Sequence, residues 1–279
     1  MTPFTAPRAA FGAVALLLLL PATHAHAGAW TRDAGGWFLK LGIEQWETAQ
    51  RFDLVGSRVD FIAPEGGFVT GGDYRNQAFR AYAEYGITAD WTVAAATALE
   101  RVQTRGNGQT FERSGVSDLT LQLRRRLIAA PLVISVLGEV KVPAGYDAAR
   151  APALGSGQAD FGGRLAAGRS LGDLYLTGEA GYRVRGGRVD EIPFSVEAGL
   201  TLLDEVLVRG ELSGAMSMRT PLTAGPFDPA TAESRYLSGG LALVLLGEPL
   251  DLVFGVDHVL GGRNALAGTR YSFSIWHTR

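Results

Sequence analysis

Apolar and polar residues alternate along most of this chain, with the period of a β-strand that has two different faces. Leu119, Leu121 and Leu123 fall on one face of such a segment, and Thr120 and Gln122 fall on the other. Similar segments begin near residues 36, 74, 91, 116, 132, 159, 174, 191, 206, 235, 250 and 269. The pattern predicts an all-β chain of about 12 strands.

A soluble β-sandwich would also alternate, so the length of the segments has to decide between it and a membrane barrel. The segments run about 11–13 residues, enough for a tilted strand to cross a bilayer, whereas strands in globular proteins commonly have about 5–6. We therefore expect a transmembrane antiparallel up-and-down β-barrel whose apolar face meets outer-membrane lipid.

The connections between these segments alternate between short and long. Short turns are expected at 88–90, 129–131, 171–173, 204–205 and 247–249, and long loops at 49–73, 105–115, 144–158, 186–190, 219–234 and 261–268. Short periplasmic turns and longer extracellular loops are typical of outer-membrane barrels, so we expect both termini in the periplasm. The apolar loop 49–73 is expected to extend the strands as a hairpin, or else to fold inward as a constriction. Loop 219–234 is expected over the mouth.

The first 27 residues resemble a secretory signal peptide. Arg8 precedes an apolar run from Ala9 to Leu20, and the small-x-small sequence Ala25-His26-Ala27 follows. The run is too short for a membrane-spanning helix. We expect cleavage after Ala27, which leaves one barrel domain over residues 28–279.

Composition excludes several classes of function. The chain has no Cys, which excludes disulfides, thiol catalysis and a lipidated cysteine. Without Arg8, the domain has 25 basic residues (26 less one) and 28 acidic ones, so nothing favours nucleic-acid binding. No Cys or paired His supports a metal site, and no cofactor is expected.

Charged residues of both signs alternate with the apolar ones and are expected to line the lumen. They could form a cross-strand network that fills and stiffens the barrel, or a charged constriction that selects solutes. A barrel of this size is compatible with a narrow pore or a plugged lumen. The lumen-lining candidates are Lys40, Glu44, Arg80, Glu84, Glu100, Arg124, Arg126, Glu139, Lys141, Asp160, Arg164, Glu179, Arg183, Glu197, Arg209 and Glu211, with Asp251 and Asp257 on the same face.

A run of three arginines and a set of aromatic residues near strand ends also predict where their side chains lie. The run Arg124-Arg125-Arg126 is expected to place two guanidinium groups in the lumen and one towards lipid headgroups. Aromatic residues near strand ends are expected to form an interfacial girdle. They are Trp37, Tyr85, Trp91, Tyr236, Tyr271 and Trp276.

Catalysis is poorly supported. Only His258 and His277 follow residue 27, and no G-x-S-x-G motif is present. Asp257 and His258 are neighbours whose side chains point to opposite faces of a strand, so Asp257 is not expected to orient His258. We expect a protein that is not an enzyme.

Short motifs spread over the chain resemble one family of barrels. They are Gly28-Ala29-Trp30-Thr31, Tyr82-Ala83-Glu84-Tyr85-Gly86 with Asp90, Val116-Ser117-Asp118-Leu119, Pro143-Ala144-Gly145-Tyr146-Asp147, LGSGQADF over 154–161, Glu179-Ala180-Gly181-Tyr182-Arg183 and Asp190-Glu191-Ile192. They resemble the XagA-like outer-membrane barrels of proteobacteria, which lie near the MetA-pathway barrels of phenol degradation. The chain departs from barrels of this class, which usually end on an aromatic residue read by the assembly machinery, because it ends Trp276-His277-Thr278-Arg279.

The resemblance implies an outer-membrane location and a transport role, and it supplies no catalytic residue. The expected function is a passive channel or transport component for small molecules. The alternative is a closed structural or interaction barrel whose extracellular loops bind a surface partner or polysaccharide. The expected partners are outer-membrane lipid, the barrel-assembly machinery and a small-molecule solute, without nucleic acid.

Overall fold

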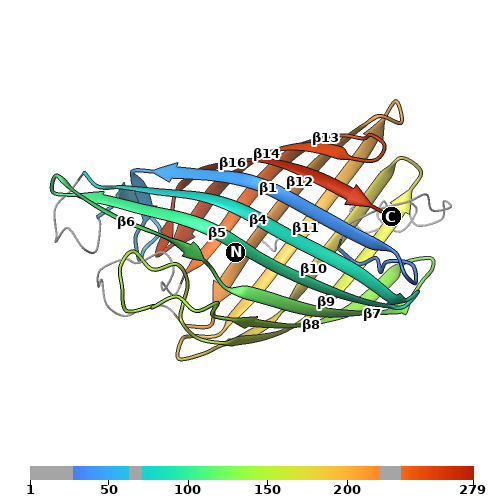
Figure 1. Ribbon diagram of the computed structural model, residues 1–279, viewed down its shortest axis with the longest axis horizontal. Coiled ribbons are helices and arrows are strands. Elements are labelled where there is room, and N and C mark those ends of the chain that lie inside the picture. Colours follow the sequence, from blue (N-terminus) through green and yellow to red (C-terminus); the bar gives the residue numbers. More distant parts are fainter. Residues whose placement is uncertain (1–27, 63–70, 220–233) are drawn as a thin grey trace, which may run out of the picture.

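The computed structural model describes residues 28–62, 71–219 and 234–279, which form a closed antiparallel β-barrel and contain no helix (Figure 1). The predicted fold class of a 12-stranded barrel is confirmed. The ring consists of β1 (Trp37–Thr48), β4 (Asp73–Thr88), β5 (Trp91–Gly106), β7 (Leu119–Ile128), β8 (Val133–Val142), β9 (Asp160–Leu171), β10 (Leu174–Arg185), β11 (Glu191–Leu202), β12 (Val206–Ser217), β13 (Arg235–Leu245), β14 (Asp251–Arg263) and β16 (Gly268–Thr278). The expected signal peptide, residues 1–27, lies outside the described residues.

The ring closes where the first and last strands meet. β1 pairs with β16 from Phe38–Thr278 to Glu47–Thr269, and with β4 along its other edge. Closure removes free strand edges, so backbone N–H and C=O groups are paired around the ring, as hydrocarbon requires. Within the described residues, no helix is long and apolar enough to cross a membrane.

The barrel has two distinct ends. Short connections, such as the one between Thr88 and Trp91, lie at the end that holds Arg279, on the right of Figure 1; we call it the turn end. The opposite end carries the β5–β6 arm and the longer connections, and we call it the loop end.

The alternation of the sequence separates the two faces of the sheet. Large apolar side chains such as Phe161, Val196 and Leu241 are exposed on the outer face, with Leu241 at 64%. Their neighbours on the inner face are enclosed, and Ala98 is 2% exposed. An uninterrupted apolar outer face around a closed sheet is the arrangement that lipid stabilises.

A charge placed on the outer face should therefore destabilise the barrel. Val196 lies in the middle of β11 and is 57% exposed. We expect Val196→Arg to lower the free energy of unfolding in lipid vesicles by about 2–4 kcal/mol, because the guanidinium would face hydrocarbon. Val55→Arg is the matched control, since Val55 is exposed in a loop-end turn. A loss at Val55 equal to that at Val196 would contradict this assignment of the outer face.

Residues 105–115, expected as a loop, instead form most of a β-hairpin. β5 runs to Gly106, and β6 (Gln109–Val116) pairs with its outer half. Asn107 and Gly108 both have positive φ, at 52° and 72°, as a two-residue hairpin turn requires. The prediction was wrong because an Asn-Gly turn continues the strands beyond the bilayer. β6 and β7 share β5 as partner, with Ser117 between them.

The first long connection, expected over residues 49–73, contains a hairpin, as one of the two expectations stated. The hairpin does not extend the barrel strands. β2 (Gln50–Phe52) pairs with β3 (Arg58–Asp60) and with β15 (Ala265–Leu266) in a separate small sheet. Phe52 and Phe61 are buried rather than exposed. Residues 63–70, and 220–233 of the loop expected over the mouth, lie outside the described residues.

Candidate functional site

The interior of the barrel holds a network of ion pairs on one side, along β8 to β11. Glu139 is 4% exposed and accepts from Arg164 at 3.0 Å and Arg183 at 2.7 Å. Each arginine has a second carboxylate, Glu179 at 2.5 Å for Arg164 and Glu191 at 2.6 Å for Arg183. Opposite charges on adjacent strands thus pair with one another, and Glu139 is the central carboxylate of this series of ion pairs.

Further ion pairs join the candidates of β1, β4 and β5. Arg80 lies 2.6 Å from Glu44 and 3.6 Å from Glu100, so one guanidinium bridges two neighbouring strands. Towards the loop end, Lys141 lies between Asp118 at 2.9 Å and Asp160 at 2.8 Å.

The inner face of β11 and β12 contributes a third group. Arg209 pairs with Glu197 and donates from Nε to the Tyr175 hydroxyl at 3.0 Å. Asp257 on β14 accepts from the Ser238 hydroxyl at 2.7 Å. Glu211 lines the same space as Arg209 and has no ion pair among the described residues.

The residues before β1 run inside the barrel at the turn end. The Ser135 hydroxyl donates to the Ala29 carbonyl at 2.5 Å, and Arg124 donates to the Trp30 carbonyl at 2.9 Å. Arg32 binds Glu84 at 2.5 Å, and Glu84 also pairs with Arg124 at 3.3 Å. We call residues 28–36 the inner segment. The sequence motif Gly28-Ala29-Trp30-Thr31 gave no sign of this placement.

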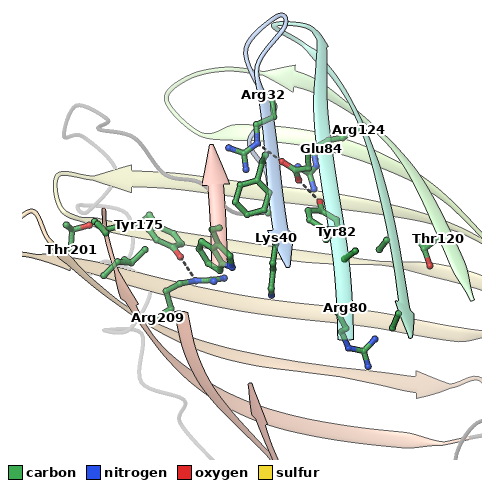
Figure 2. Close-up of a pocket in the computed structure, with 18 of the residues that line it drawn as sticks. Arg32, Lys40, Arg80, Tyr82, Glu84, Thr120, Arg124, Tyr175, Thr201 and Arg209 are labelled. Atoms are coloured by element: carbon green, nitrogen blue, oxygen red, sulfur yellow. Dashed lines mark hydrogen bonds and ion pairs between the residues drawn. The ribbon is translucent and has the colours of Figure 1, made fainter. Parts of the chain in front are cut away.

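A cavity of about 770 Å³ runs beside the inner segment. Figure 2 shows charged side chains reaching into it, with Arg32 and Glu84 joined on one side and Arg209 and Tyr175 on another. It extends from Thr120 in mid-barrel to Thr201 and Asp204 at the turn end. The inner segment therefore narrows the lumen without filling it.

Small residues leave room on the side of the barrel opposite the network. These small residues lie on the inner faces of β1, β13, β14 and β16, whereas the charged network lies on β8 to β11. They are Gly42, Gly240, Ala242, Gly255, Ser272 and Ser274. We call them the small-residue strip. A Cβ added to Gly42 would lie 2.7 Å from the Ser274 Cβ on the adjacent strand, so a side chain at position 42 would clash with β16.

Loop-end residues narrow the other mouth with an apolar cluster. Phe61, Tyr74, Val102, Leu154 and Leu266 pack together, with Trp46 and Tyr146 against them. We call these seven residues the loop-end cluster. Its members come from β1, β4, β5 and three separate connections. No periodicity in the sequence could indicate it, because loop residues far apart in the chain meet only after the barrel has closed.

Tyr146 fixes one of these connections to the barrel. Its hydroxyl donates to Asp118 and accepts from the Gly157 backbone N–H at 2.9 Å. Burial, helped by the bond to Asp118, raises the pKa of Tyr146 well above its ordinary value. The phenol therefore stays protonated and keeps donating at any physiological pH.

The three members of the arginine run have different partners. Arg124 binds the inner segment and Glu84, whereas Arg126 pairs with Asp90 at 2.9 Å near the turn end. Arg125 lies over the Trp91 ring at 5.2 Å. Arg124 thus points inward, Arg125 lies against an outer aromatic residue, and Arg126 is bound to the turn between β4 and β5.

Two residues expected in the aromatic girdle lie inside the barrel instead. Trp276 packs against Phe38, with ring centroids 5.7 Å apart, and its Nε1 donates to Ser274. Tyr236 lines the same interior space as Glu211 and Ser213. The expectation was wrong because position near a strand end does not specify a face, and both residues have inward parity.

Asp257 and His258 do not form a pair. His258 Nδ1 lies 2.8 Å from the Thr269 hydroxyl, while Asp257 is bound to Ser238. Among the described residues, no group of three or more His, Cys, Asp or Glu side chains is placed to hold a metal ion.

Neither a protein-family profile nor a curated protein matches the sequence. Several solved structures are similar in fold. The COG4313 outer membrane channel from Pseudomonas putida F1 has a TM-score of 0.71 at 12% identity, over 92% of this chain and 100% of that one. The NanC porin has a TM-score of 0.51 at 6% identity, over 85% and 97%. The translocator domain of the autotransporter NalP from Neisseria meningitidis has 0.51 at 11%, over 87% and 88%. The chain therefore has the fold of outer-membrane β-barrels.

Proposed function

We propose that the protein is a passive channel for small molecules in the bacterial outer membrane, with both termini in the periplasm. The observation that carries the proposal is the cavity of about 770 Å³, which continues past the inner segment to Thr201 and Asp204 at the turn end.

The charged candidates support the proposal as the walls of this path. The network around Glu139 stiffens one side, since its members satisfy one another across four strands. The small-residue strip leaves the opposite side open. Solutes would pass between the charged network and the small-residue strip. The path therefore favours small hydrated molecules and excludes large ones.

Permeation should depend on solute size. In liposomes that contain the refolded protein, we expect swelling in isotonic solutions of small solutes such as glycerol and arabinose, and none with raffinose. The physical reason is the narrowing by the inner segment and by the loop-end cluster. Liposomes without protein are the control. Equal swelling with all three solutes, or none with any of them from folded protein, would overturn the proposal.

The loop-end cluster should act as a second constriction of the path. Leu154 is 5% exposed and fills the space beside Gly115, where a Cβ would lie 2.8 Å from the leucine Cδ1. We expect Leu154→Ala to loosen the cluster and to speed swelling in arabinose. Val55→Ala, at an exposed position of the loop end, should leave the rate unchanged. Slower swelling with Leu154→Ala would contradict a constriction at this mouth.

The same cluster gives the second candidate function its support. A mouth at which seven side chains pack together suits an interaction barrel whose loops bind a surface partner or polysaccharide. Silent liposomes, together with binding of isolated outer-membrane polysaccharide to folded protein, would favour that alternative.

The proposal also covers the family, the signal peptide and the partners of the protein. The chain is a member of the XagA-like group on the motifs quoted above, residues 1–27 are its signal peptide, and it has no catalytic activity. Lipid of the outer membrane and the barrel-assembly machinery are its expected partners. Secretion to the outer-membrane fraction of a Gram-negative host, with cleavage after Ala27 read by N-terminal sequencing, would test these points.

A further inference from the structure

One basic residue that lines the cavity beside the inner segment forms no ion pair with any described residue. Of the five basic residues that line it, Arg32, Arg80, Arg124 and Arg209 each form an ion pair. Lys40 forms no ion pair or hydrogen bond with any described residue. Its neighbour Glu44 is held by Arg80 at 2.6 Å, and Glu211, which lines an adjoining space together with Lys40, lies too far away for an ion pair with it. An ammonium group in a confined site is costly unless water or an anion satisfies it.

A second cation lies at the same place. The Lys40 Nζ lies 5.7 Å from the centre of the Trp276 ring, and the Arg209 Cζ lies 5.0 Å from it. Figure 2 shows Lys40 of β1 and Arg209 of β12 reaching into one part of the cavity. Two like charges beside one indole repel each other, and an anion placed near both would relieve that repulsion.

Apolar rings adjoin these charges. Phe38 is 8% exposed, and its ring lies 5.7 Å from that of Trp276 and 6.1 Å from that of Tyr82, centre to centre. The Arg32 guanidinium lies 4.7 Å from the centre of the Phe38 ring, so most of the aromatic wall that a ligand could reach belongs to Trp276. Leu207 of β12 lines the same cavity. A site with one free ammonium, a guanidinium and an aromatic wall matches a ligand with a carboxylate at one end and a flat apolar body at the other.

We infer that Lys40, Arg209 and Trp276 form a binding site for small aromatic carboxylates, with the carboxylate at Lys40 and the ring against Phe38 and Trp276. The inference deepens the proposed channel function, because it names the class of solute that the lumen selects. Lys40 supplies the specific charge, since Arg209 is already shared with Glu197 and Tyr175.

Isothermal titration of the refolded, detergent-solubilised protein tests the site without any need for conduction. The probes are sodium benzoate and benzamide, which share a shape and differ in charge. We expect benzoate to bind about tenfold more tightly than benzamide, as one charge-assisted contact implies. Lys40→Gln should remove that preference and Lys40→Arg should keep most of it. Arg150→Gln, which removes one positive charge from an exposed loop, should leave it unchanged.

The outcomes separate this inference from the proposed function. Equal binding of benzoate and benzamide to the wild type would overturn the site, even in a protein that conducts solutes. Retention of the preference in folded Lys40→Gln would overturn the role of Lys40. Selective benzoate binding by a barrel that passes no solute would support the site and overturn the channel. The comparison of two probes on the wild type stays decisive if a variant fails to fold.

Discussion

Deletion of residues 28–34 will raise the single-channel conductance of the refolded barrel several-fold. The first of these residues lie inside the lumen, where Ala29 and Trp30 are held through their carbonyl groups by Ser135 and Arg124. Their removal would join the cavity to the whole turn-end opening, and conductance rises with the cross-section of the narrowest part. The measurement is the current step in a planar bilayer, with heat-modifiable gel mobility as proof of folding.

A milder change should have the same sign. Glu84 lies at the junction between the inner segment and the wall, because it binds both Arg32 and Arg124. Glu84→Gln would keep the side chain's size and weaken both contacts, so we expect brief openings to a larger step. Glu112→Gln is the control, because Glu112 pairs with Arg101 at an exposed position of the β5–β6 arm. A deletion variant that conducts no more than the wild type would show that the inner segment does not limit the path.

Substitution of Glu139 by Gln will cost the barrel about 3 kcal/mol of unfolding free energy. The carboxylate is nearly enclosed and pairs with both Arg164 and Arg183, so its loss removes one of the two counterions of each guanidinium group. Each arginine keeps one other partner, which limits the loss. The measurement is equilibrium unfolding in urea from lipid vesicles.

Glu179→Gln is the matched control for Glu139→Gln. Glu179 accepts from Arg164 alone and is 17% exposed, so its removal should cost about 1 kcal/mol. Equal losses at the two positions would mean that the network does not act through its central carboxylate, and that these ion pairs contribute little to stability.

The architecture could be predicted because alternation and segment length reflect the bilayer itself. Phe161, Val196 and Leu241 are exposed on the outer face for the same reason that they alternate with polar residues in the sequence. Pairing within the lumen also follows from parity, as Arg80 with Glu44 illustrates. Neither result depends on contacts between distant loops.

The features that control access to the lumen could not be predicted in this way. The inner segment has no strand period, and its contacts join Ala29 to Ser135 and Arg32 to Glu84, far apart in the sequence. The loop-end cluster likewise joins Phe61, Leu154 and Leu266. Trp276 was expected at the lipid interface, because an aromatic residue near a strand end is typical of a girdle, yet its parity places it in the lumen.

The most direct test of a water-filled path uses the absence of cysteine from the chain. Ser272 and Phe273 are neighbours on β16, with Ser272 in the small-residue strip and Phe273 against Phe254 on the outer face. Single-channel current would be recorded from Ser272→Cys and Phe273→Cys while a charged, water-soluble methanethiosulfonate reagent is added. We expect discrete current steps that shrink on modification of Ser272→Cys and stay constant for Phe273→Cys. No current from folded protein, or no response at Ser272→Cys, would contradict it.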